Sequence, residues 1–325
     1  MNMDCDTFTK RDWTVNKMED TFWIEAEDCT QLYIKKWHTV SEPKAILQIS
    51  HGMAEHIMRY EVFAHLFNEN GFIVYGHDHR GHGQTGVKQG LLGYLAKSDG
   101  FHKAAEDLIA VSNLAKQDHP DLPLFLFGHS MGSFLTRYAL LEHSKLYDGI
   151  ILAGTGSFSK IEVSAGKAIS RLLNPNQPSP FLNKLVFGSY NKKTPNPKTE
   201  FDWLSRDEQE VEKYLDDPLC GFIPTARFFY DLFSGLEMIS DNKRMKSIQA
   251  NLPFLLISGT ADPVGSYGKG VMKTAHQFKD AGIKQVKVVL LEDARHEILN
   301  ELDKESTQQI ILEWLNKRLE NPSLK

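Results

Sequence analysis

The segment PLFLFGHSMGSFLTRYALL, residues 123–141, joins two kinds of secondary structure with almost no chain between them. The apolar run Leu124–Phe127 predicts a buried strand, and the residues after Gly132 follow a helical pattern. Gly128 and Gly132 flank Ser130 in a G-x-S-x-G turn. Glycines let a strand and a helix approach closely, so such a turn lifts a serine hydroxyl clear of a sheet. Ser130 is therefore a candidate nucleophile, although a Gly-rich turn without a chemical role has the same pattern.

Short apolar runs recur along the chain and alternate with helical patterns. Each run is too short for a helix and too uniformly apolar for a half-exposed strand, which predicts parallel strands covered on both faces. Two further strands, at 22–24 and 32–37, have the mixed pattern of an antiparallel edge. The sequence thus predicts a doubly wound, mostly parallel α/β sheet. The six apolar runs are 45–49, 72–75, 124–127, 149–153, 254–257 and 286–291.

The alternation is interrupted once, by a segment with several prolines and short helical patterns. We expect residues 1–156 and 251–325 to form the α/β core, and residues 157–250 to be an inserted helical cap. Eight of the 19 phenylalanines lie in this insertion. Most of these rings should pack the cap onto the core, and some are candidates for lining an apolar substrate cavity.

Composition restricts the possible partners and the compartment. The net charge is -5 and no block of lysine or arginine is present, so a nucleic-acid partner is not expected. No apolar run is long enough to span a bilayer, and the N-terminus lacks the apolar region of a signal peptide. Cys5, Cys29 and Cys220 are widely spaced and odd in number, which favours a reducing, cytoplasmic location over a disulfide framework.

A serine nucleophile needs a base, and the base needs an acid that orients it. In a sheet of this kind the chain order is Ser, then Asp or Glu, then His. Asp262 follows the apolar run 254–257, and His296 follows the run 286–291, so both belong to the carboxyl edge of the sheet. Glu292 and Asp293 are alternative acids, but they are too near His296 along the chain to orient its ring easily. His276 falls within a helical pattern and is expected to be a surface or packing residue.

The tetrahedral intermediate of acyl transfer also needs hydrogen-bond donors for its oxyanion. The backbone N–H of Met131, directly after Ser130, is one candidate. The second donor should come from the loop after the strand 45–49, where Gly52 gives the backbone freedom and Met53 supplies the N–H.

Several motifs, in this order, resemble the α/β-hydrolases of the monoacylglycerol lipase and bacterial lysophospholipase group. They are HGMAEH at 51–56 with RY at 59–60, DHRGHG at 78–83, GHSMG at 128–132, DP at 262–263 and RHE at 295–297. In the insertion, WLSRD at 203–207 and DPLC at 217–220 are similar to stretches typical of the lysophospholipase-like members. The resemblance implies an α/β-hydrolase fold with a Ser130, Asp262 and His296 triad, and with Met53 and Met131 as oxyanion donors.

Two positions depart from the pattern of this group. Ala54 stands where the eukaryotic lipases usually have glycine, and Ser133 stands where a second glycine is common. Neither belongs to the implied triad, but both are expected beside the acyl pocket. Glu55 and Arg59 suggest a charged pair that braces the loop carrying Met53.

The sequence HDHRGH at 77–82 has the H-x-H-x-x-H spacing of a metallohydrolase zinc site. The metallo-β-lactamase pattern requires an acid where Gly81 stands, so a structural loop is the favoured interpretation. In that interpretation Asp78 and Arg80 form ion pairs or bond to loop backbone. No metal or cofactor is expected.

These features together predict a serine carboxylic-ester hydrolase that acts on acyl monoesters, such as monoacylglycerols or lysophospholipids, through an acyl-enzyme intermediate. The alternatives are a short-chain carboxylesterase, a peptidase of the same fold and a non-catalytic binding protein on that fold. The partner is a small-molecule acyl ester, and transient contact with a membrane surface is compatible with the Phe-rich cap. The cap lysines are better explained as a solvated face than as a phosphate site; they are Lys184, Lys192, Lys193 and Lys198.

Overall fold

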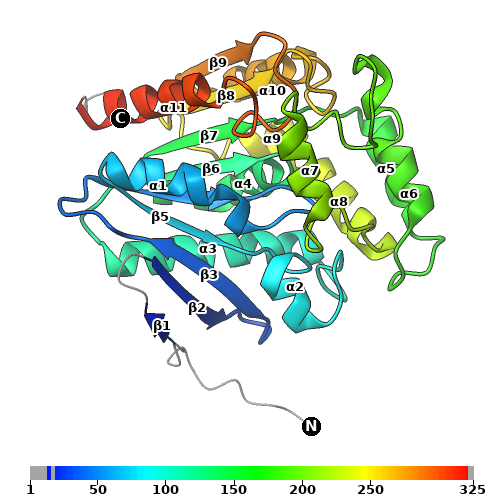
Figure 1. Cartoon of the computed structure of the whole chain (residues 1–325), viewed down its shortest axis with the longest axis horizontal. Helices are drawn as coiled ribbons and strands as arrows, with labels where there is room; N and C mark the ends of the chain where they lie inside the picture. The colour runs from blue at the N-terminus through cyan, green and yellow to red at the C-terminus, as the bar shows by residue number, and fades with distance from the viewer. Residues whose placement is uncertain (1–12, 16–18, 321–325) are drawn as a thin grey trace.

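The computed structural model describes residues 13–15 and 19–320 of the chain. Its described strands form one sheet of nine, in the order β1-β2-β3-β5-β4-β6-β7-β8-β9 (Figure 1). Three N-terminal strands pair antiparallel, and the other six pair parallel with one another. The predicted α/β fold is therefore confirmed, including its antiparallel edge.

Each predicted apolar run is a parallel strand. Five strands are buried along their whole length because helices cover both faces of the sheet: β4, β5, β6, β7 and β8. The strands are β1 (Trp13–Val15), β2 (Glu19–Glu25), β3 (Gln31–Trp37), β4 (Ala45–Ser50), β5 (Phe72–His77), β6 (Leu124–His129), β7 (Gly149–Ala153), β8 (Phe254–Gly259) and β9 (Val286–Leu291).

The prediction of coverage on both faces is wrong for β9. This strand lies at the end of the sheet order and pairs only with β8. Its residues are half-buried or exposed, and Leu290 is among the exposed large apolar residues. An edge strand has one neighbour and incomplete helix cover, so an apolar sequence there does not require complete burial.

Helices cover the two faces of the sheet and divide the core into two apolar clusters. One face packs on α1 (Glu61–Glu69) and α11 (Lys304–Glu320), and the other on α3 (Gly100–Asp118), α4 (Met131–His143) and α10 (Lys269–Asp280). A short helix, α2 (Gly83–Gln89), follows β5. Single 3₁₀ turns occur at η1 (Ile57–Tyr60), η2 (Ser144–Leu146) and η3 (Tyr190–Lys193).

Residues 157–250, between β7 and β8, contribute helices and no strand of the sheet among the described residues. We propose that this segment is the cap, and call it the proposed cap below. Polar side chains begin its helices, including a capping box formed by Ser159 and Glu162. Its helices are α5 (Lys160–Ser170), α6 (Pro180–Phe187), α7 (Glu208–Asp216), α8 (Ala226–Ile239) and α9 (Asn242–Met245), which gather at the right of Figure 1.

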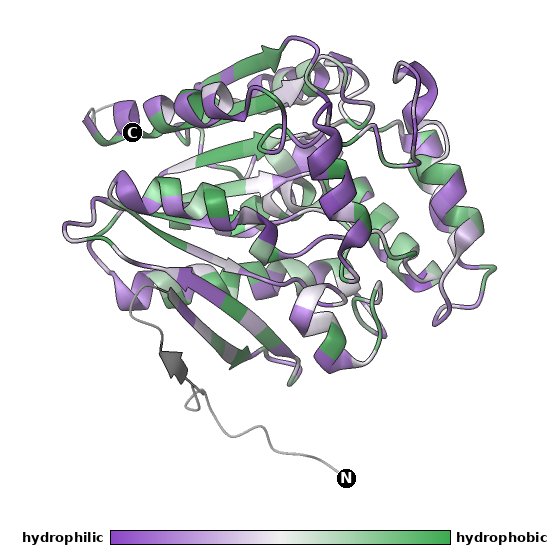
Figure 2. Cartoon of the chain, viewed as in Figure 1, coloured by the Kyte–Doolittle hydropathy of each residue, from purple (hydrophilic) through white to green (hydrophobic). Residues whose placement is uncertain are grey.

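The proposed cap packs on the core through α8, which contacts α3 and α4. Phe228 and Phe229 of α8 are fully buried, as expected for rings that attach the insertion, whereas Phe181 of α6 is exposed. Apolar and polar residues are interspersed along α5 and α6 at the outer edge of Figure 2.

Arg137 of α4 joins two distant parts of this region. Its guanidinium is buried and donates to the carbonyl of Gly156 at 2.8 Å and to the carbonyl of Ile239 at 3.4 Å. Gly156 directly precedes the proposed cap, and Ile239 ends α8. Burial lowers the pKa of Arg137 to about 10, and no carboxylate among the described residues offsets this effect.

Cys29 takes part in a disulfide, so the expectation of a chain without disulfides is wrong. Cys220 is free and buried. The cysteine pattern therefore no longer favours a reducing compartment. Within residues 13–15 and 19–320, no helix combines the length and the apolar character needed to cross a membrane.

Candidate active site

Ser130 occupies the turn between β6 and α4 with φ 51° and ψ -119°, a backbone conformation that non-glycine residues rarely adopt. Its N–H donates to the carbonyl of Ala153 at the end of β7, at 2.9 Å. Its carbonyl accepts hydrogen bonds from the backbone N–H and the hydroxyl of Ser133. The strained turn is held from both sides, which is the geometry that the G-x-S-x-G sequence predicts.

The two glycines beside Ser130 are required by close packing. A Cβ atom on Gly132 would lie 2.0 Å from the carbonyl oxygen of Ser50, and one on Gly128 would lie 2.5 Å from the hydroxyl oxygen of Thr136. Real Cβ atoms do not approach other atoms so closely. The backbone of α4 therefore passes directly over the end of β4.

Asp262 and His296, from the loops after β8 and β9, form a buried pair. Nδ1 of His296 lies 3.0 Å from Oδ1 of Asp262, and both side chains are buried. Asp262 also accepts hydrogen bonds from the Ser258 hydroxyl at 3.0 Å and from the N–H of Val264 at 2.8 Å. Burial raises the pKa of Asp262, but the His296 imidazole and these hydrogen bonds outweigh burial and hold the pKa below its usual value.

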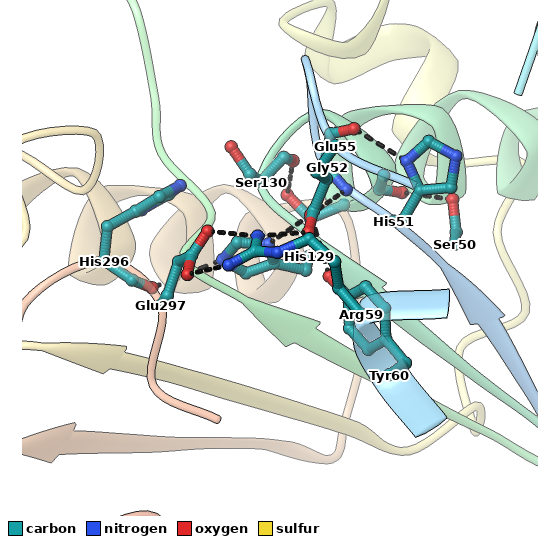
Figure 3. Close-up of polar contacts among 12 residues, drawn as sticks. Ser50, His51, Gly52, Glu55, Arg59, Tyr60, His129, Ser130, His296 and Glu297 are labelled. Atoms are coloured by element: carbon teal, nitrogen blue, oxygen red, sulfur yellow. Dashed lines mark hydrogen bonds and ion pairs between the residues drawn. The ribbon is translucent and has the colours of Figure 1, made fainter. Parts of the chain in front are cut away.

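Ser130 and His296 approach the same end of β7. The Ser130 N–H binds Ala153, and a Cβ atom on the next residue, Gly154, would lie 2.9 Å from Cε1 of His296. Figure 3 shows the His296 imidazole extending toward the side on which Ser130 lies. Because Nδ1 faces Asp262, the free nitrogen of this ring is Nε2. The predicted acid, base and nucleophile are thus gathered at the carboxyl edge of the sheet, whereas His276 is exposed on α10.

The loop after β4 runs beside Ser130. A Cβ atom on Gly52 would lie 3.3 Å from Cβ of Ser130. The backbone just before Met53 therefore lies next to the strained turn at Ser130, called the elbow below. Met131 is the first residue of α4, where backbone N–H groups have no partner within the helix. Ala54 has φ 54°, a left-handed conformation that glycine adopts more readily than alanine.

Glu55 and Arg59 pair as expected, and Glu297 joins them in a buried network (Figure 3). Arg59 donates to Glu55 at 2.8 Å and to both carboxylate oxygens of Glu297 at 2.6 and 2.7 Å. Glu55 also accepts from the N–H of Gly52 at 2.5 Å and from the Tyr60 hydroxyl at 2.9 Å. The network connects the loop after β4 to the loop that carries His296.

His129, the residue before Ser130, lies between this network and His296. Its Nδ1 is 3.2 Å from Glu55, its Nε2 is 3.3 Å from the carbonyl of His296, and the rings of His129 and His296 are 4.7 Å apart. Burial alone lowers the pKa of His129, but the contact with Glu55 outweighs it and raises the pKa. Burial raises the pKa of Glu55, yet His129 and Arg59 more than compensate and hold it well below its usual range. Glu55 therefore remains ionised.

The proposed cap also reaches His296. The Trp203 ring lies 5.1 Å from the His296 ring, and the N–H of Glu297 donates to the carbonyl of Leu204 at 2.7 Å. Arg295 donates to the carbonyls of Asp202 and Ser205. The segment 202–205 thus fixes the loop that carries His296.

A cavity of about 240 Å³, lined by both charged and apolar side chains, lies beside the Glu55–Arg59–Glu297 network. It is lined mainly by side chains of η1, α1, α7, α11 and the segment before α11, including Lys213 and Lys304. None of the eight phenylalanines of the insertion is among its described lining residues. An apolar cavity lined by those rings stays a prediction.

The histidines of the HDHRGH segment bond within the protein interior. His79 lies 3.1 Å from His77 and 3.2 Å from the Ser50 hydroxyl, and its N–H donates to His51. Asp78 accepts from the N–H groups of Ile57 and Gln84, while Arg80 forms an ion pair with Asp107. These ion-pair and backbone contacts are those expected of a structural loop.

A nucleophile elbow at the carboxyl edge of a doubly wound sheet, with a buried Asp–His pair in the following loops, defines the α/β-hydrolase class. Residues 41–303 match the family described as "Serine aminopeptidase, S33", and the chain belongs to this family. The prediction of an α/β-hydrolase enzyme of the monoacylglycerol lipase group is confirmed.

Individual proteins show the same relationship. The chain is 28% identical to the monoglyceride lipase of Mus musculus over 90% of this chain and 89% of that protein. It is 26% identical to the monoacylglycerol lipase of Mycolicibacterium smegmatis over 86% of this chain and 90% of that protein. A thermostable carboxyl esterase from Bacillus coagulans, solved with glycerol, superposes with a TM-score of 0.87 at 28% identity, covering 94% of this chain and all of that one.

Proposed function

We propose that this protein is a serine carboxylic-ester hydrolase that acts on monoacylglycerols. The observation that carries the proposal is the buried 3.0 Å contact between His296 and Asp262, beside the strained elbow of Ser130. Nε2 of His296 accepts the proton of the Ser130 hydroxyl as the oxygen attacks the ester carbonyl. The N–H groups of Met53 and Met131 stabilise the oxyanion. His296 then returns the proton to the leaving alcohol and activates the water that releases the fatty acid.

The choice of monoacylglycerols is supported by the names of the relatives, two of which are a monoglyceride and a monoacylglycerol lipase. Lysophospholipids have the same single acyl chain and a larger polar headgroup, and they are the closest competing substrates. A short-chain carboxylesterase remains the alternative, because the similar structure from Bacillus coagulans is called a carboxyl esterase.

The outer helices of the proposed cap support transient contact with a lipid surface, where such substrates are dissolved. Exposed apolar side chains occur on and between α5 and α6, and Lys184 lies among them; the apolar residues are Ile161, Leu172, Phe181 and Leu185. Burying such side chains in the boundary of a bilayer is favourable. A cytoplasmic location stays a prediction.

The decisive experiment combines an active-site probe with a substrate panel. A fluorophosphonate should label the wild-type protein and the Ser41→Ala variant, which changes an exposed serine, but not Ser130→Ala. Ser130→Ala should lower kcat by roughly 10⁶-fold. The panel contains a long-chain monoacylglycerol, the matched lysophosphatidylcholine, p-nitrophenyl acetate and an aminoacyl p-nitroanilide. The highest kcat/KM is expected for the monoacylglycerol.

Each other outcome would indicate a different activity. Labelling of Ser130→Ala would show that another residue is the reactive nucleophile. No labelling of the wild type would favour a non-catalytic protein on this fold. Turnover of the acetate alone would identify a short-chain esterase. Turnover of the p-nitroanilide alone would identify a peptidase.

A further inference from the structure

Three side chains with metal-binding atoms meet where the proposed cap contacts the core, apart from Ser130, Asp262 and His296. They are His56, in the loop after β4, and Asp217 and Cys220, in the turn after α7. One ligand atom from each, a ring nitrogen, a carboxylate oxygen and a sulfur, lies within 4.8 Å of the other two. His56 and Cys220 are buried and Asp217 is half-buried.

The backbone holds these three residues in place without any ligand. The N–H of Cys220 donates to the carbonyl of Asp217 at 3.0 Å, which closes a tight turn. The N–H of Gly221 then donates to the carbonyl of Ala54 at 3.0 Å, two residues before His56. The two segments that supply the side chains are therefore already joined, and little ordering is needed to bring the ligand atoms together.

We propose that His56, Asp217 and Cys220 form a binding site for a divalent transition-metal ion, with Zn²⁺ as the best match. Imidazole nitrogen, thiolate sulfur and carboxylate oxygen are the three ligand types that Zn²⁺ takes from proteins. Mg²⁺ and Ca²⁺ prefer oxygen ligands alone, so the sulfur and nitrogen exclude them as good occupants. Three protein ligands leave a fourth tetrahedral position for water.

Metal binding at these atoms requires no redox step. The Cys220 thiol loses its proton to solvent as the sulfur–metal bond forms. His56 Nε2 now donates a hydrogen bond of 2.8 Å to the Asp217 carboxylate. On metal binding Nε2 gives up this proton to solvent, the neutral ring carries its one proton on Nδ1, and the hydrogen bond is replaced by two metal–ligand bonds.

The metal site lies between the proposed cap and the loop that carries Met53. Asp217 lines the 240 Å³ cavity beside the Glu55–Arg59–Glu297 network, which gives an ion access from solvent. A bound ion would link the turn after α7 to the loop that carries Met53. The metal would therefore restrain the proposed cap relative to the loop beside Ser130, at a distance from the reacting atoms.

The test uses Co²⁺ as a spectroscopic substitute for Zn²⁺ on the full-length protein. Titration of the wild type should give a thiolate-to-cobalt charge-transfer absorption that saturates at one equivalent and is abolished by Zn²⁺. Cys220→Ser should lose this absorption, and His56→Gln should weaken binding by more than the roughly 10–100-fold typical of losing an outer-shell partner. His276→Gln is the matched control, since this histidine is exposed on α10, and it should bind as the wild type does.

A second measurement needs no variant. Stoichiometric Zn²⁺ should slow alkylation of Cys220, read by mass spectrometry of its peptide, and should raise the unfolding temperature in proportion to the logarithm of free metal. The proposal is overturned if the wild type gives no thiolate absorption, if Cys220→Ser retains it, or if Zn²⁺ leaves alkylation of Cys220 unchanged.

Discussion

Four buried histidines beneath the loop after β4 predict a steep loss of stability in mild acid. His51, His77, His79 and His82 are fully buried, and burial is the main cause that lowers the pKa of each ring. The pKa of His77 falls to about 3 and that of His82 to about 4. In the unfolded chain each ring binds a proton with a pKa of about 6.5. The unfolded state therefore binds more protons than the folded state, and the free energy of unfolding decreases as the pH drops below about 6.5.

The size of this effect follows from proton linkage. At pH 5.5 each neutral ring costs about 1.4 kcal/mol relative to neutral pH, or ~5.6 kcal/mol for the four. Asp78 acts in the opposite direction, because burial raises its pKa to about 6, and it offsets roughly 1 kcal/mol. The net loss is comparable to the whole stability of many domains, about 5–15 kcal/mol. The unfolding temperature should drop by on the order of 10 °C between pH 7.5 and 5.5.

The assay is urea unfolding followed by tryptophan fluorescence at several pH values from 7.5 to 5.5. His77→Gln removes one of the four rings and should reduce the slope of stability against pH by up to one proton, about 1.4 kcal/mol per pH unit. His276→Gln, on the surface of α10, should leave the slope unchanged. A wild-type stability that is flat over this range, or an equal slope in His77→Gln, would refute the linkage argument.

Two further substitutions test the parts that hold the site. Glu55→Gln should lower kcat about 10–100-fold and the free energy of unfolding by about 3–5 kcal/mol. The reason is that it leaves buried Arg59 with one carboxylate and weakens the hydrogen bond from the Gly52 N–H. Wild-type turnover of Glu55→Gln in esterase assays would contradict this role. Gly132→Ala should abolish labelling by the fluorophosphonate, since its Cβ would meet the Ser50 carbonyl at 2.0 Å, whereas Gly90→Asn, at an open left-handed position, should label normally. Equal labelling of the two glycine variants would show that the elbow tolerates a side chain.

The strands were predictable because the burial of a central strand is visible in its own few residues. A parallel strand covered on both faces must be apolar throughout, and the six runs therefore stand out in the sequence. The exposure of β9 was not predictable in the same way, since its sequence is as apolar as that of a central strand and only its place at the sheet edge sets its burial.

The candidate site was predictable where chain order carries the information. The turn at Ser130 is a local pattern, and the proposed acid Asp262 and base His296 follow it in the chain order that is typical of this fold. His129 and Trp203 carry no such signal of a role. His129 is the variable residue of G-x-S-x-G, and its contacts with Glu55 and the His296 loop arise only when three distant segments meet. The same limit applies to the disulfide at Cys29, which spacing did not indicate.

The buried guanidinium of Arg137 sets a boundary on how the insertion above the sheet can move. From α4, it binds the carbonyl of Gly156 before the first inserted helix and the carbonyl of Ile239 at the end of α8. Separating either carbonyl from it would leave a charge in the interior with fewer donors satisfied, which is costly. A rigid swing about the two roots of the insertion is therefore disfavoured. We therefore expect the base of the insertion, where Arg137 binds both carbonyls, to keep its position during turnover.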